Sequence, residues 1–195
     1  HWYKEKGPTL PPAGQHFERF VFEEAGGPEI FDIWHKAARP GYGAAQTWHS
    51  SMPVALHSST WCGDRSISYL NNQNENEPFC SWISFPDPHH PFDCPTPWST
   101  MYNLDDIDLP KEGNKDLDNR PWWHKASLES EPNLADPQLK FFRAKLSRSV
   151  DQTEKQLREM TANYFGMISL IDHNVGRILL ELKRLGLDKN TIIVY

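Results

Sequence analysis

The sequence predicts an α/β fold with a mostly parallel sheet, and two helix-to-strand pairs carry that prediction. Residues 54–70 place apolar side chains at helical spacing and are followed by the apolar run Phe79–Phe85. Residues 151–185 show the same spacing over a greater length and lead into the apolar, β-branched segment Thr191–Tyr195. A helix that passes through a short turn into such a strand is half of a parallel crossover unit. We therefore expect both apolar segments to be sheet strands.

The first 50 residues are expected to be mostly loop. They are rich in Gly, Pro and aromatic residues, and their only alternating pattern is a weak one at Phe17–Phe22. The next segment is different, because Leu56, Thr60, Ile67 and Leu70 fall on one face of a helix. The polar residues 71–78 then end that helix.

The strand expected at Phe79–Phe85 runs directly into a proline-rich turn that presents two adjacent imidazoles, His89 and His90. Open α/β sheets place their chemistry just beyond the carboxyl ends of strands, so this turn is a candidate site. A histidine there can accept a proton or, once protonated, stabilise an oxyanion near neutral pH. Asp87 can orient His89 or cap the turn. Cys80, inside the expected strand, is interpreted as a small buried hydrophobe.

Residues 111–150 are expected to be mostly irregular, and a long helix follows them. Asp151 with Glu154 resembles a capping box, and Gly186 supplies a left-handed stop before the turn at 188–190. Between them, apolar side chains recur at steps of three or four residues. The expected buried face consists of Met160, Tyr164, Met167, Ile171, Val175, Ile178, Leu182 and Leu185.

Composition excludes some classes of function. The formal charge of −6 disfavours a non-specific nucleic-acid binder but is compatible with a small anionic substrate. No apolar run approaches the ~20 residues that cross a bilayer. Three cysteines, an odd number without CxxC spacing, predict neither a disulfide framework nor a structural zinc site. The compartment stays open.

Three other groups of residues allow two interpretations each. Asp105, Asp106 and Asp108 could bind Ca²⁺, but the Gly and terminal Glu of an EF-hand loop are missing, which favours a solvated acidic loop. Asp172 and His173, adjacent on the long helix, could be a metal pair, but they point about 100° apart and do not converge on one ion, which favours helix-to-loop hydrogen bonding. An aromatic set can line a pocket for an aryl substrate or fill the shell of a small core. Its members are Trp98, Tyr102, Trp122 and Trp123.

Three stretches resemble, in the right order, the sulfatase family of the alkaline phosphatase superfamily, which includes arylsulfatases and phosphonate monoester hydrolases. Residues 84–110, SFPDPHHPFDCPTPWSTMYNLDDIDLP, resemble the central signature of the family. Residues 57–70 resemble the helix that precedes this signature. Residues 164–195 resemble the helix and strand that lead to the family's metal-binding Asp-His-Gly segment.

The resemblance implies an alkaline-phosphatase-like α/β/α sandwich, with residues 1–195 as the central part of one catalytic domain. Family members hold a divalent cation, with Ca²⁺ expected first and Mg²⁺ or Mn²⁺ as alternatives. It lies beside a formylglycine whose hydrated aldehyde attacks sulfur or phosphorus. The family's Pro-His-x-Pro-Phe motif matches Pro88–Phe92, which places its substrate-contacting histidine at His89. His90 occupies the variable position and is a second substrate-binding candidate.

The chain departs from the family where the nucleophile should be. The formylglycine motif is Cys/Ser-x-Pro-x-Arg, but Cys94 has its proline one place too late and no arginine, and Cys62 lacks the proline. We expect the formylglycine and the metal ligands to lie outside this chain, with no metal ligand inside it. The 195 residues alone are therefore expected to be inactive.

The expected function of the whole protein is hydrolysis of sulfate esters, with a small anionic ester as substrate. One alternative is a phosphonate monoester or phosphodiester hydrolase on the same scaffold. Another is a degenerate family member that lost its nucleophile and acts as a binding domain. The sequence is compatible with an oligomer.

Overall fold

The computed structural model describes most of the chain. The described residues are 16–24, 26–27, 29–30, 33, 36–74, 77–111, 118–126, 128, 133–138, 140–141 and 151–195. The expectation that 1–50 and 111–150 are mostly loop falls in part outside these ranges.

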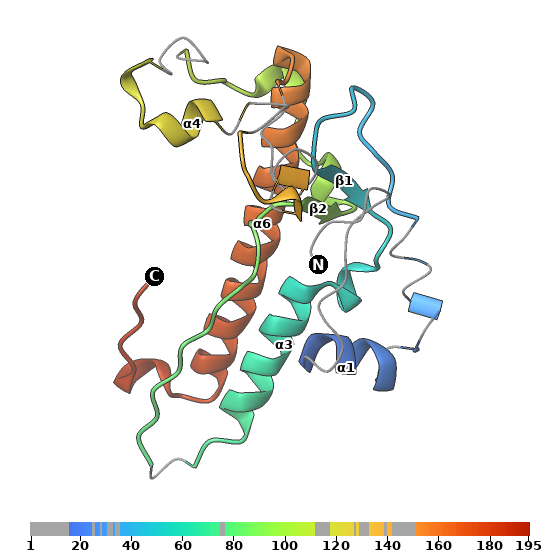
Figure 1. The fold of residues 1–195 in the computed structure, drawn as a ribbon. Coiled ribbons are helices and arrows are strands. Elements are labelled where there is room, and N and C mark those ends of the chain that lie inside the picture. The colour runs from blue at the N-terminus through green and yellow to red at the C-terminus, as the bar shows by residue number, and fades with distance from the viewer. Residues whose placement is uncertain are drawn as a thin grey trace.

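The longest element is helix α6 (Glu154–Arg184), which runs the height of the molecule and contacts most other elements (Figure 1). It confirms the predicted helix, but its start differs from the expected one. The capping box is formed by Thr153 and Gln156, not by Asp151 and Glu154, because the Thr153 hydroxyl accepts from the Gln156 amide and the Gln156 side chain accepts from the Thr153 amide. At the other end Gly186 has φ of +70°, the left-handed stop that the sequence predicts.

Helix α3 (Ser58–Asn71) lies beside the second half of α6, and the two run in the same direction (Figure 1). They approach closely because Gly63 faces Asn174. A Cβ at Gly63 would lie 2.6 Å from Asn174 Oδ1. Leu70, Ile178 and Leu182 form a buried apolar cluster between the helices. Two polar links cross the same seam, from Arg177 to Asp64 and from Arg184 to Asn71.

The described strands are β1 (Thr47–Ser50) and β2 (Phe92–Pro95), which pair in parallel with Thr47 opposite Phe92. They lie against the first half of α6, where Asn163 reaches both. Its side-chain amide donates to the Trp48 carbonyl at 3.0 Å and to the Phe92 carbonyl at 2.6 Å. One buried side chain thus binds the helix to both strands.

The prediction that Phe79–Phe85 is a sheet strand is wrong for the described residues. The segment is extended and runs beside α6 toward β2 (Figure 1), but it pairs with no described strand. Thr191–Tyr195 is likewise extended and unpaired. The apolar pattern is that of a strand, but a strand also requires a neighbour to bond its amides. Cys80 is exposed rather than buried for the same reason.

Helix α1 (His16–Glu23) occupies the place of the weak alternation at Phe17–Phe22 and packs beside α3. Phe17 and Val21 are both buried against Met52. They are four residues apart, which is the spacing of one helix face and not that of an alternating strand. The short helix α4 is Trp122–Ala126. Single helical turns occur at Val54–Leu56 (η1), Trp98–Thr100 (η2), Leu104–Asp106 (η3) and Asp188–Asn190 (η5). Among the described helices, none has the length and apolarity needed to cross a membrane.

Candidate functional site

The candidate site is the turn that carries His89 and His90, between the extended segment and β2. Both side chains are exposed, and their rings stack with centroids 4.3 Å apart. Partial burial, and then the neighbouring His89, lower the pKa of His90. At neutral pH His90 is therefore uncharged.

The hydrogen bond of His89 determines which nitrogen is free. Nδ1 of His89 contacts the carbonyl oxygen of His90. Because a carbonyl only accepts, Nδ1 carries a hydrogen and donates it. Nε2 is then the nitrogen that can bind or release a proton.

Asp87, two residues before His89, faces the interior rather than His89. Its Oδ2 accepts a short hydrogen bond from the Ser59 hydroxyl and lies 3.7 Å from Nδ1 of His57. Ser59 is in the first turn of α3, where a carboxylate is favoured by the unpaired amides of the helix start. Among the described residues, Asp87 thus makes no bond to His89 itself, and it ties the turn that carries His89 to α3.

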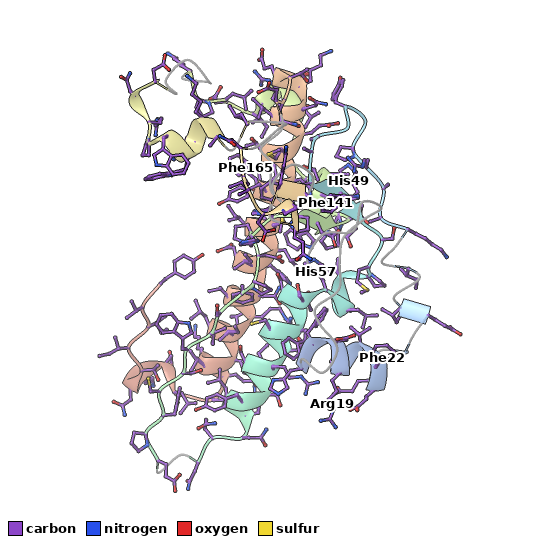
Figure 2. The ribbon with its side chains drawn as sticks, in the orientation of Figure 1. Arg19, Phe22, His49, His57, Phe141 and Phe165 are labelled. Carbon is purple, nitrogen blue, oxygen red and sulfur yellow. The ribbon has the colours of Figure 1, made fainter. Side chains whose placement is uncertain are left out.

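His57 links the start of α3 to β2 (Figure 2). Its Nδ1 accepts from the Ser59 backbone amide at 3.3 Å, so the ring hydrogen is on Nε2, which lies 3.2 Å from the Asp93 carbonyl oxygen. The side chain is 95% buried, with a relative exposure of 5%. His57 is therefore a structural cap of α3 with both ring nitrogens occupied.

Asp93 brings a buried carboxyl next to this group. Burial raises its pKa to about 6, against the opposing effects of His57 and Ser50. Its Oδ1 has no hydrogen-bond partner among the described residues. A buried carboxyl without a cation to pair with is stabilised in its protonated form.

The other charged candidates do not form a site. Asp105, Asp106 and Asp108 are exposed, in agreement with the solvated-loop interpretation. His173 packs against Trp98 with ring centroids 5.5 Å apart, and Asp172 beside it is exposed. In the part of the chain that the structure describes, no three His, Cys, Asp or Glu side chains are grouped to hold a metal.

Two of the three free cysteines, Cys62 and Cys94, lack the features of a nucleophile. Burial raises the pKa of the Cys94 and Cys62 thiols, so both are protonated at neutral pH. Cys62 donates to the Ser84 carbonyl at 3.4 Å, which helps attach the extended segment to α3.

The predicted aromatic set is divided between two places. Tyr102 packs edge-on against Phe165 of α6, and its hydroxyl bonds the Ser169 hydroxyl at 2.7 Å. Trp122 and Trp123 contact each other on α4, with exposures of 76% and 52%. The aromatic side chains that approach the histidine pair are others: His90 contacts Phe92, which packs on Tyr164.

Sequence reasoning missed Ser59 and Asp93. A serine in the first turn of a helix is so common that it carries no signal. Asp93 sits in an apolar strand between Phe92 and Cys94, and an acidic residue in such a strand is a signal that could have been used.

Comparison with known proteins places this chain in a family. The sulfatase family model matches residues 1–195. An arylsulfatase of Clostridium perfringens is 32% identical over 142 residues, which cover 72% of this chain and 26% of that protein. The multifunctional alkaline phosphatase superfamily protein PehA of Trinickia caryophylli is 26% identical over 165 residues, 84% of this chain and 31% of the relative. The chain thus spans between a quarter and a third of the length of these relatives.

Solved structures show the same fold. The phosphonate monoester hydrolase of Agrobacterium radiobacter superposes with a TM-score of 0.63 at 21% identity, over 91% of this chain and 34% of that one. The enzyme of the same description from Silicibacter pomeroyi gives a TM-score of 0.56 at 16% identity, over 80% and 29%. The predicted alkaline-phosphatase-like α/β fold is confirmed.

Proposed function

The chain belongs to the sulfatase family, and from this we propose that the whole protein hydrolyses sulfate esters, with His89 acting on the substrate. The carrying observation is the match of the family model to all 195 residues, which includes the His89 turn. The relatives are three to four times longer than the matched region, so the reaction is a proposal about the whole protein.

The geometry of His89 supports its part in this proposal. Its ring is exposed, its Nδ1 hydrogen is bonded to the His90 carbonyl, and its Nε2 is available. In the protonated form Nε2 donates to a charged ester oxygen, or to the oxygen of the leaving alcohol as the ester bond breaks. His90, uncharged, offers a flat surface beside the ester and is proposed as a substrate contact.

The family's metal and formylglycine do not fit the residues described here. Those residues hold no group of three metal-ligating side chains, and no Cys/Ser-x-Pro-x-Arg motif occurs in the sequence. We propose that both are supplied by other parts of the whole protein, and no catalytic step is assigned to them here.

A second candidate function is hydrolysis of phosphonate monoesters. It is favoured by the solved structures that share this fold, both described as phosphonate monoester hydrolases. Sulfate and phosphonate esters present tetrahedral anionic oxygens to the same side chains, so the His89 turn accommodates either. The main proposal rests on the relatives by sequence, one of which is an arylsulfatase.

The deciding experiment measures kcat/KM of the whole protein for an aryl sulfate and for the matched aryl phosphonate monoester. A higher value for the sulfate supports the proposal, and a higher value for the phosphonate supports the second candidate. Turnover of neither ester contradicts both and favours a degenerate, binding family member. Peptide mapping of the native protein then checks that third outcome, since it should find no formylglycine peptide.

A further inference from the structure

The turn that presents His89 is held at two points, and only one of them belongs to the sheet. After the turn, the Phe92 amide donates to the Gln46 carbonyl at 2.7 Å, and the Phe92 carbonyl accepts from Asn163. Before it, Asp87 is bonded to the Ser59 hydroxyl of α3. His89 lies between these attachments, so its position depends on both.

The bond between Asp87 and Ser59 affects His89 because Asp87 and His89 belong to the same hydrogen-bonded turn. The His89 amide donates to the Pro86 carbonyl at 3.3 Å, which makes Asp87 the second residue of a four-residue turn that ends at His89. The Asp87 side chain is 13% exposed and points away from solvent. Movement of its carboxylate would therefore rotate the turn and displace the imidazole.

The surroundings of Asp87 favour a fixed carboxylate. Ser59 is fully buried, and its backbone amide donates to His57 Nδ1, so the hydroxyl has a defined place in the first turn of α3. The positive end of the helix adds an attraction for the negative charge. A hydroxyl-to-carboxylate bond at a buried helix start is stronger and more directional than a solvent-exposed ion pair.

We propose that Asp87 is a positioning residue for His89, and that the Ser59 hydroxyl and the first turn of α3 hold it in place. The expected effect on catalysis rests on the proposed function. The expected effect on the orientation of His89 does not. Asp87 and Ser59 act by holding His89 in position, and neither contacts the substrate.

The test compares Ser59→Ala, Asp87→Asn and Ser59→Thr with the wild-type whole protein, and uses Ser58→Ala as the matched control in the same helical turn. We expect Ser59→Ala and Asp87→Asn to lower kcat by about 10- to 100-fold, because misplacing a reacting group by about 1 Å has effects of this size. KM should change less. Ser59→Thr, which keeps the hydroxyl, should restore kcat, and Ser58→Ala should leave it unchanged.

A second readout does not need activity. The NMR signals of the His89 imidazole, from histidine-labelled whole protein, should shift in Ser59→Ala and Asp87→Asn but not in Ser58→Ala. Unchanged His89 signals and unchanged kcat in folded Ser59→Ala and Asp87→Asn would overturn the inference. If the wild type hydrolyses neither ester, the proposed function fails and the NMR comparison alone decides the positioning role.

Discussion

At the scale of single residues, His89 carries the clearest prediction. We expect His89→Ala to lower kcat/KM of the whole protein for its ester by about 10²- to 10⁴-fold, since that is the usual contribution of a positioned acid or base. Steady-state kinetics measure it, with His16→Ala as control because His16 is an exposed histidine on another element, α1. Equal activity of the His89 and His16 variants would remove His89 from the mechanism.

Asp93 carries a prediction about stability and pH. The folded protein holds the Asp93 proton up to pH about 6, whereas the unfolded chain releases it near the ordinary value of 3.8. The folded state therefore binds more protons between these values, and the free energy of unfolding decreases as pH rises from about 4 to about 6. Above pH 6 the full cost of the buried charge remains, on the order of a few kcal/mol.

Asp93→Asn keeps the shape of the side chain and removes this ionisation. We expect the variant to match the wild type at pH 4 and to be more stable at pH 7, by urea unfolding of the whole protein at both values. A stability difference that does not change with pH would show that Asp93 does not titrate between folded and unfolded states in this range.

Residue-scale features were the hardest to predict from the sequence. His89 stands out because of its prolines and its family motif, and those are visible in the order of the letters. The partner of Asp87 is not, because Ser59 is 28 residues away and any of the neighbouring serines, Ser58 included, has the same chemistry. Which serine hydroxyl reaches Asp87 depends on how α3 is oriented about its own axis relative to the turn.

At the scale of elements, α6 contains two glycines that differ in their surroundings. A Cβ at Gly166 would lie 2.9 Å from Cys94 Sγ and closer still to the Trp98 carbonyl, whereas nothing lies within 4 Å of a Cβ at Gly176. We expect Gly166→Ala to destabilise the whole protein by about 1–3 kcal/mol through overpacking. Gly176→Ala should stabilise it by about 0.5–1 kcal/mol, because alanine favours the helix.

Thermal unfolding of the two variants provides the comparison. The two changes in stability should have opposite signs, and this is more informative than their sizes, because the substitution is the same and only the neighbouring atoms differ. Destabilisation of both by the same amount would mean that α6 and β2 do not approach as closely as described.

Element boundaries show what a sequence pattern can and cannot predict. The length of α6 follows from the apolar repeat, and its end follows from Gly186. Its start was misplaced by two residues, because Asp151 with Glu154 and Thr153 with Gln156 satisfy the same capping rule. The buried face also includes Asn163 and Asn174, which hydrophobicity alone would assign to solvent. They are buried because each amide has backbone carbonyls to bond.

At the scale of the whole molecule, two apolar segments are left without a described sheet partner. Trp82 and Ile192 are each 93% exposed, and the backbone amides of 79–85 and 191–195 donate to no other described residue. The matched relatives are three to four times longer, and we propose that other parts of the whole protein pair with these segments. Their strand-like sequence predicts that pairing.

Hydrogen exchange of the whole protein checks this proposal. We expect the amides of 79–85 and 191–195 to exchange slowly, as paired strands do, with the stretch 108–111 as a fast-exchanging control. Fast exchange in all three segments would mean that the apolar segments stay unpaired in the whole protein.

The fold class was predictable from sequence because it depends on the order of helices and apolar segments. The strand pair that forms was not. β1 and β2 are four residues each, and Thr47–Ser50 has no apolar alternation to mark it. These strands exist because the Asn163 amide and the parallel partner satisfy their carbonyls, which are contacts from distant parts of the chain.

The arrangement of contacts around α6 also has a consequence for synthesis on the ribosome. Two of the residues that α6 binds lie far before their partners in the sequence, Asp64 by 113 positions and Trp48 by 115, so α6 is translated long after the elements that it covers. At a translation rate of about 5–20 residues per second, the apolar face of α3 stays uncovered for several seconds before α6 is made. Contacts this distant in sequence also form slowly once all the residues are present. A nascent chain halted before residue 154 should therefore bind chaperones more strongly than a longer one in which α6 has left the ribosome and covers α3.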